Sequence, residues 1–185
     1  GPHAPTVPIH ELKLATMIRI RAVEVADAAA LASAYRANRR FLAPWEPIRD
    51  DAFYTPGGQR SRIATGRSDA ASYGCVILDD DGSIVGTIAL SGIVRGPAQS
   101  ANLGYWVAES STGRGLATEA VRLILDVAFG ELDLHRVQAG TLRHNVGSQK
   151  VLERNGFERI GVARSYLLIA GEWQDHVLFQ RITDR

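Results

Sequence analysis

The clearest hydrophobic pattern lies in residues 102–129, where one kind of periodicity gives way to another. Apolar side chains first alternate with other residues, at Leu103, Tyr105 and Val107, which is typical of a strand. Further along, apolar residues recur at the three-and-four spacing of one buried helical face, at Ala117, Ala120, Val121, Ile124 and Ala128. Small residues and two glycines separate the two patterns. The segment therefore predicts a strand, a glycine turn and a helix in direct succession.

The same reading predicts the other elements of the chain. Further strands are expected at 17–23, 73–78, 84–90, 136–142, 157–169 and 173–182, and further helices at 28–40, 59–65 and 149–154. Asp27 is a candidate N-cap, and Asn155-Gly156 suits a left-handed helix end. Turns at residues 79–82 and 170–172 predict two hairpins. The order β-α-α-β-β-β-α-β-α-β-β predicts a single α/β domain (α+β mixed sheet) over residues 17–185.

Composition narrows the classes of function. The 185 residues are 45% hydrophobic and 22% charged with a net charge of +1, so no general field favours nucleic acid, and no apolar run is long enough to span a bilayer. The single cysteine, Cys75, is expected as a core thiol in a reducing, cytoplasmic setting. The three aspartates at 79–81 are expected to form a solvated turn, and we expect no metal. Residues 1–16 are expected to be an N-terminal extension, in part a remnant of protease cleavage.

The glycine turn predicts an anion site. Free backbone N–H groups and the positive end of the helix dipole meet where a strand passes through glycines into a helix. The turn lacks the Gly-Lys-Ser/Thr ending of a P-loop and the third glycine of a dinucleotide fingerprint. An ordinary strand-to-helix turn is the alternative that these residues leave open.

Three stretches carry a family resemblance. Residues 112–117 (TGRGLA) resemble the pyrophosphate loop of the GNAT acetyltransferases, with Thr112 at a position where that family has Gln or Arg. Asn145-x-x-Ser148 followed by Gly156-Phe157, and residues 41–47 (FLAPWEP), resemble the RimJ/RimL branch, most of all its RimJ-type members. That branch acetylates the N-terminal amines of ribosomal proteins. The resemblance implies the GNAT (acyl-CoA N-acyltransferase) fold, a splayed mixed β-sheet flanked by helices.

The resemblance also implies acetyl-CoA as cosubstrate and a set of residues that hold it. The cofactor-binding residues expected on this basis are Trp106, Val107, Ala108, Thr112, Gly113, Arg114, Gly115, Leu116, Ala117, Thr118, Asn145 and Ser148. In that arrangement the pantetheine arm lies against the backbone near Val107, whose N–H polarises the thioester carbonyl. Asn145 is expected either to contact the ligand or to cap the short helix, and both roles are compatible.

The resemblance implies catalytic roles as well. Many family members use a tyrosine at the position of Leu152 to protonate the leaving thiolate, and Ser148 is the substitute expected here. Glu46, held between two prolines beside Trp45, is the expected general base. Trp45, Glu46 and Tyr105 are expected to face the acceptor. RimL-like enzymes have a glutamate base in a strand at the position of Leu167, so that assignment does not carry over to this chain. Weaker candidates for the base are Glu109, Glu158 and Glu172.

The resulting hypothesis is acetyl transfer to an N-terminal α-amine, with alanine expected first, on a ribosomal protein. An α-amine has a pKa of about 7.7–8.0 and is partly neutral at neutral pH, so it needs a base less than lysine does. The alternatives are transfer to a small amine or antibiotic, and acyl-CoA binding without catalysis. The protein is expected to be a monomer or homodimer. Trp106, Trp173 and His176 are expected in the core by default, or else in an acceptor groove or dimer interface.

Overall fold

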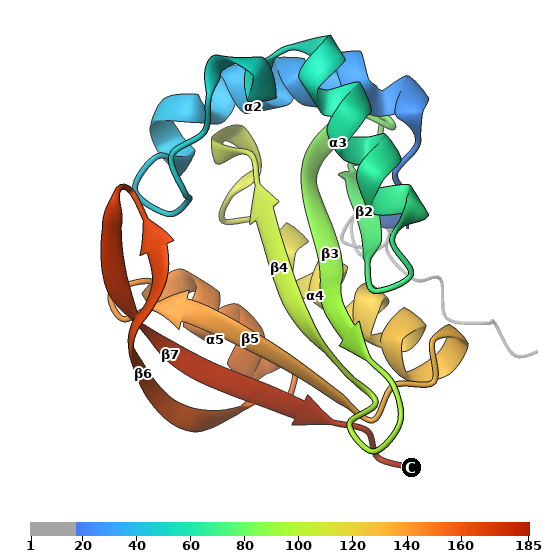
Figure 1. Cartoon of the computed structure of the whole chain (residues 1–185), viewed down its shortest axis with the longest axis vertical. Coiled ribbons are helices and arrows are strands. Elements are labelled where there is room, and N and C mark those ends of the chain that lie inside the picture. Colours follow the sequence, from blue (N-terminus) through green and yellow to red (C-terminus); the bar gives the residue numbers. More distant parts are fainter. Residues whose placement is uncertain (1–17) are drawn as a thin grey trace, which may run out of the picture.

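The computed structural model describes residues 18–185 and has one seven-stranded mixed sheet in the order β1-β2-β3-β4-β5-β7-β6 (Figure 1). The strands are β1 (Arg19–Ala22), β2 (Tyr73–Leu78), β3 (Ile84–Val94), β4 (Ser100–Val107), β5 (Arg136–Leu142), β6 (Glu158–Ile169) and β7 (Glu172–Ile182). The helices are α2 (Ala28–Leu42), α3 (Pro56–Ser68), α4 (Leu116–Asp126) and α5 (Val146–Arg154). The predicted order of elements and the mixed sheet are confirmed. The extension expected at residues 1–16, and Met17 of the first strand, lie outside the described residues.

The sheet divides between β4 and β5. These two strands are parallel and pair only from Ser100 with Arg136 to Leu103 with Ala139. Beyond Leu103 both strands continue but separate, which Figure 1 shows as two strands diverging from a common base. Every other neighbouring pair of strands is antiparallel. The fold therefore leaves two strand edges facing each other without mutual hydrogen bonds.

Helices cover both faces of the β1–β4 half, because residues of β2 alternate between two cores. Cys75 and Ile77 pack in the core that contains α4, whereas Val76 and Leu78 pack in the core under α2. The helical face predicted for α4 is confirmed, with Ala120, Val121, Ile124 and Ala128 buried and Ala117 partly buried. Such two-sided burial explains why β2 reads as a nearly continuous apolar run.

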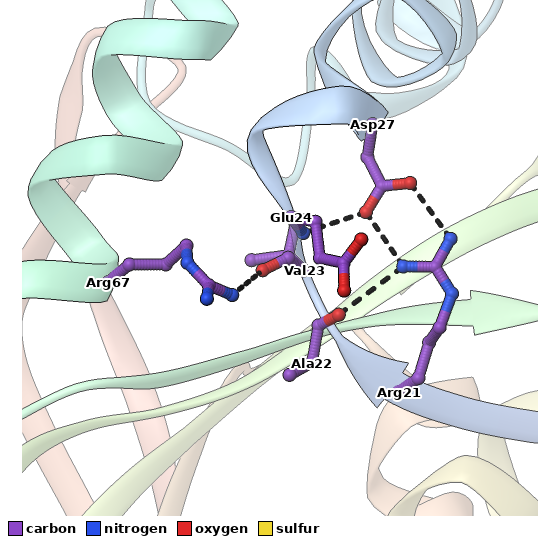
Figure 2. A network of polar contacts seen from close by, with 6 residues as sticks. All are labelled: Arg21, Ala22, Val23, Glu24, Asp27 and Arg67. Atoms are coloured by element: carbon purple, nitrogen blue, oxygen red, sulfur yellow. Dashed lines mark hydrogen bonds and ion pairs between the residues drawn. The ribbon is translucent and has the colours of Figure 1, made fainter.

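A polar network joins β1 to the helices above it (Figure 2). The two arms of the Arg21 guanidinium donate to the Asp27 carboxylate at 2.8 Å each, and the Glu24 N–H donates to it at 2.8 Å. Arg67 of α3 donates to the Val23 carbonyl at 2.6 Å. The Arg21 guanidinium lowers the pKa of the Asp27 carboxyl. Asp27 occupies the N-cap position of α2, as predicted, but within residues 18–185 its side chain makes no capping hydrogen bond to that helix. Its carboxylate oxygens accept from Arg21 and from the Glu24 N–H instead.

Two helices begin earlier than the pattern predicts. Helix α3 begins at Pro56, because the Thr55 hydroxyl accepts the Gly58 N–H at 3.0 Å and caps the first turn. Gly57 and Gly58 therefore lie inside the helix rather than before it, since the predicted helix began at residue 59. Helix α5 begins at Val146, directly after its cap Asn145, rather than at residue 149.

The turns follow their sequence signals. The hairpin between β2 and β3 closes through a Gly82 N–H bond to the Asp79 carbonyl at 3.1 Å, with Gly82 at φ 83°. Gly156 ends α5 at φ 75°, as predicted. Ala170 and Gly171 both have positive φ and connect β6 to β7.

Three of the four residues expected in the core are buried, and the fourth is exposed. Cys75, Trp106 and His176 are buried, and burial raises the pKa of the Cys75 thiol to about 11. Trp173 is 65% exposed, so the default of core packing is wrong for it. It lies in the hairpin turn region of the outer strands, where a side chain points to solvent. None of the helices within residues 18–185 has the length and apolar character needed to cross a membrane.

Candidate active site

A cleft of about 460 Å³ opens beside the splayed end of β4, between the start of α4 and α5. Its lining comes from four stretches of the chain and consists of Phe41, Leu42, Trp45, Tyr105, Trp106, Val107, Ser111, Thr112, Gly113, Gly115, Leu116, Ala117, Thr118, Asn145, Gly147, Ser148, Val151 and Arg154. Its volume lies within the range of small-molecule sites.

The start of α4 offers unpaired backbone donors to this cleft. Gly113 and Gly115 have φ values of 75° and 74°, a region that glycine enters at little cost. No side chain in the described part of the chain caps α4. The N–H groups from Gly115 to Thr118 donate no other hydrogen bond within residues 18–185. Four free N–H groups at the positive end of a helix dipole suit a phosphate.

The strand edges supply further backbone groups. The Ala108 N–H donates to the Val85 carbonyl of β3 at 2.7 Å. Because successive N–H groups along a strand point to opposite sides, the Val107 N–H points away from β3, toward the gap beside β5. The separated edge of β4 is therefore available to an extended ligand carrying amide groups.

The opposite wall is the first turn of α5. The Asn145 side chain accepts the Ser148 N–H at 3.1 Å, so the capping role predicted for Asn145 is confirmed. Ser148 reaches across the cleft, with its Oγ 2.7 Å from the Tyr105 hydroxyl of β4. This contact joins the two walls by a pair of hydroxyl groups. Asn155 adds a second link, since its Nδ2 donates to the Thr118 carbonyl at 3.1 Å.

Trp106 is held on the other face of β4. Its indole Nε1 donates to the Tyr35 hydroxyl at 3.0 Å, and the two ring centroids lie 4.8 Å apart. Trp106 is 7% exposed and packs in the core under α2. The backbone at Trp106 and Val107 is thereby fixed beside the cleft.

Trp45 and Glu46 differ in position although they are adjacent. Trp45 lines the cleft, and its ring centroid lies 5.2 Å from that of His144. The Glu46 carbonyl accepts the Ala170 N–H at 2.9 Å, which ties the loop to the β6–β7 hairpin. The Glu46 side chain lines a separate small cavity between α2 and Tyr54. Burial raises the pKa of the Glu46 carboxyl, and the charges of Arg49 and Arg62 offset part of the rise.

Most of the predicted site residues meet in this one cleft, but several do not. Ala108, Arg114 and Glu46 are absent from its lining, as are Glu109, Glu158 and Glu172. The pattern also passed over Gly147, Val151 and Arg154, which share the cleft-facing side of α5 with Ser148. Helical spacing from Ser148 would have indicated Val151 at i+3.

A second cavity, of about 520 Å³, lies between α3 and strands β1–β3. Its lining includes Gln59, Tyr73 and Cys75 but no predicted site residue. The Gln59 Oε1 atom is buried there without a hydrogen-bond partner in the described chain. Residues 18–185 contain no group of three His, Cys, Asp or Glu side chains that could hold a metal ion.

Comparison with known proteins gives one consistent family. A family model described as an acetyltransferase (GNAT) domain matches residues 18–158. Over 164 residues the chain is 40% identical to a Bacillus subtilis protein named Probable N-acetyltransferase YjcK, covering 86% of this chain and 90% of that protein. It is 37% identical over 163 residues to the [Ribosomal protein uS5]-alanine N-acetyltransferase of Escherichia coli, covering 86% of this chain and 84% of that one. Among solved structures, RimJ of Mycobacterium smegmatis in complex with CoA-disulfide superposes with a TM-score of 0.86 at 34% identity, covering 90% of this chain and 82% of that chain.

Proposed function

The chain belongs to the GNAT acetyltransferase family, and we propose that it transfers an acetyl group from acetyl-CoA to the N-terminal α-amine of a protein. One observation carries the proposal. A single cleft combines the free N–H groups that begin α4, the unpaired edge of β4 and the Tyr105–Ser148 hydroxyl pair. In an acyl carrier the phosphates need the N–H groups, the amides need the strand edge, and the thioester needs the hydroxyl pair.

The residues present fit acetyl-CoA. The pyrophosphate suits the N–H groups from Gly113 to Thr118, because the positive φ values leave the backbone open to a close approach. The pantetheine amides suit the exposed edge of β4, in the manner of an added strand. Asn145, whose side chain lines the cleft beside this edge, is proposed as a further contact, as are Thr112, Arg114 and Ala108 near the pyrophosphate loop.

The transfer then requires little covalent chemistry from the protein. The Val107 N–H, directed toward the gap, polarises the thioester carbonyl. The amine nitrogen forms a bond to the carbonyl carbon, the carbon–sulfur bond breaks, and its electron pair leaves with sulfur. The nitrogen gives up one proton to solvent and the sulfur takes one up. Ser148 lies on the wall beside the thioester and donates to the departing sulfur.

The acceptor is proposed to be the free alanine terminus of a ribosomal protein. The names of the uS5-alanine relative and of the RimJ structure support this choice. The α-amine, with a pKa of about 7.7–8.0, supplies a large neutral fraction without a strong base. That matters because Glu46, the base expected from the sequence, has a raised pKa but lines a separate cavity rather than the cleft. Trp45 and Tyr105 are proposed to contact the acceptor at the mouth.

The test is the release of CoA thiol from acetyl-CoA with a set of acceptors. The set contains peptides that begin with free Ala, Ser or Met, the same peptides with acetylated N-termini, and small polyamines and aminoglycosides. We expect turnover with free Ala or Ser termini and none with blocked ones. Turnover limited to small amines would contradict the acceptor, and binding of acetyl-CoA without turnover with any amine would contradict the enzyme reaction.

A further inference from the structure

The Tyr105 hydroxyl is hydrogen-bonded to the Ser148 hydroxyl inside the cleft. It lies 2.7 Å from Ser148 Oγ, within the normal range for an O–H···O hydrogen bond. Tyr105 belongs to β4 and Ser148 to α5, so the contact spans the two walls between which the thioester is proposed to lie.

Either hydroxyl can donate this hydrogen bond. When Tyr105 is the donor, Ser148 Oγ at 2.7 Å is a nearer acceptor than the Ser148 carbonyl at 3.4 Å, which is long for an O–H donor. The proposed arrangement has the Tyr105 hydroxyl donating to Ser148 Oγ. A serine hydroxyl carries one proton and accepts at two lone pairs. Once Oγ accepts from Tyr105, its own proton is free to turn elsewhere, and residues 18–185 offer it no other hydrogen-bond partner.

The surroundings of the pair keep the Tyr105 hydroxyl protonated, and no other cleft-lining residue of α5 competes with Ser148 as a hydroxyl donor to the ligand. Burial raises the pKa of the Tyr105 hydroxyl to about 12, so it carries its proton throughout the neutral range. Among the α5 residues that line the cleft, Ser148 alone has a hydroxyl group. Leu152, one turn later, is completely buried and has no polar atom.

We propose that Tyr105 is a positioning residue that directs the Ser148 proton at the departing sulfur, through the chain Tyr105 O–H to Ser148 Oγ–H to sulfur. The inference rests on the proposed acetyl transfer. When the carbon–sulfur bond breaks, charge gathers on sulfur, and the hydrogen bond from Ser148 strengthens because its acceptor becomes ionic. Ser148 gives the sulfur a hydrogen bond and keeps its own proton, as does Tyr105. The thiolate takes its proton from solvent, which balances the proton that the amine releases to solvent.

The test compares Tyr105→Phe, Ser148→Ala and the double variant, using the amine that the unaltered protein acetylates. Tyr73→Phe is the matched control, since it removes a hydroxyl from a half-buried tyrosine on β2 that lines the other cavity and not this cleft. We expect kcat to fall about 100-fold for Ser148→Ala and about tenfold for Tyr105→Phe. The KM for acetyl-CoA should change by less than about threefold, because a hydrogen bond to sulfur strengthens chiefly in the transition state.

The decisive result is the double variant. The Tyr105 hydroxyl acts on the sulfur only through Ser148, and Phe keeps the ring that is proposed to contact the acceptor. The double variant should therefore be no slower than Ser148→Ala. Losses that multiply, or a Tyr105→Phe variant with unchanged kcat, would overturn the relay. A Tyr105→Phe variant that only unfolds earlier or raises KM would also overturn it, as a structural tie. Turnover of small amines alone would refute the protein acceptor while leaving the relay measurable, because the leaving thiol is the same.

Discussion

Gly86 of β3 is the residue whose replacement should disturb the site most directly from outside it. A Cβ at position 86 would lie 2.1 Å from the Trp106 carbonyl oxygen and 3.1 Å from the Val107 Cα. An ordinary contact begins near 3.4 Å, so β4 would have to move by about 1.3 Å. The atoms in the way belong to the backbone, which cannot turn aside as a side chain can.

Overpacking of this kind costs about 1–3 kcal/mol, and the loss of a glycine from the unfolded chain returns about 0.4–1 kcal/mol. We expect Gly86→Ala to lose about 1.3 kcal/mol, the mid-range difference of these two effects, which for a chain of this size lowers Tm by about 3–5 °C. The rate of acetyl transfer should fall even at temperatures where the variant is fully folded, because the displaced segment carries the Val107 N–H.

The measurement is thermal unfolding, with acetyl transfer assayed well below Tm. Gly104→Ala, on the neighbouring strand, is the control for stability, since a Cβ there meets nothing within 4 Å. Equal Tm values for the two variants would refute the reasoning that β4 is held at this distance by the glycine.

Three other outcomes are expected. Tyr35→Phe should cost about 1–3 kcal/mol in urea unfolding, because the buried Trp106 indole N–H loses its acceptor; an unchanged midpoint would contradict this. Glu46→Gln should raise Tm at pH 7 but not near pH 4. The folded pKa of this carboxyl lies above its unfolded value, so the cost of burying its charge appears only as pH rises; a lower Tm at pH 7 would speak against it. Gly115→Ala should weaken CoA binding at least about tenfold by calorimetric titration, because φ 74° strains alanine by about 1–2 kcal/mol and a methyl group would enter the anion site. Gly66→Ala, in open space within α3, should bind CoA normally.

Much of the fold could be predicted from local sequence signals. Alternation in β4, the hairpin at Asp79–Gly82 and the stop at Gly156 act through neighbouring residues, so a sequence pattern can reveal them. Where local signals compete, the pattern was misleading. Thr55 and Pro56 begin α3 in spite of two following glycines. Asp27 stands at the N-cap of α2, but its carboxylate accepts from Arg21 instead of from the helix.

The site was predictable as far as one loop and one helix turn define it. The glycine turn and Asn145-x-x-Ser148 lie in the same cleft because each sits where a strand passes into a helix. The contact between Tyr105 and Ser148 joins residues 43 positions apart, and only the packing of β4 against α5 brings them together. The position of Glu46 also depends on packing between distant segments: it lines a separate cavity, and its carbonyl accepts from Ala170 of the β6–β7 hairpin.

The measurement that tests the central claim most directly is the location of the transferred acetyl group. A peptide with a free N-terminal alanine and an internal lysine is incubated with the protein and acetyl-CoA, and fragment mass spectrometry assigns the modified nitrogen. We expect acetylation of the α-amine alone. Acetylation of the lysine side chain, or an unmodified peptide under conditions in which a small amine is acetylated, would contradict it.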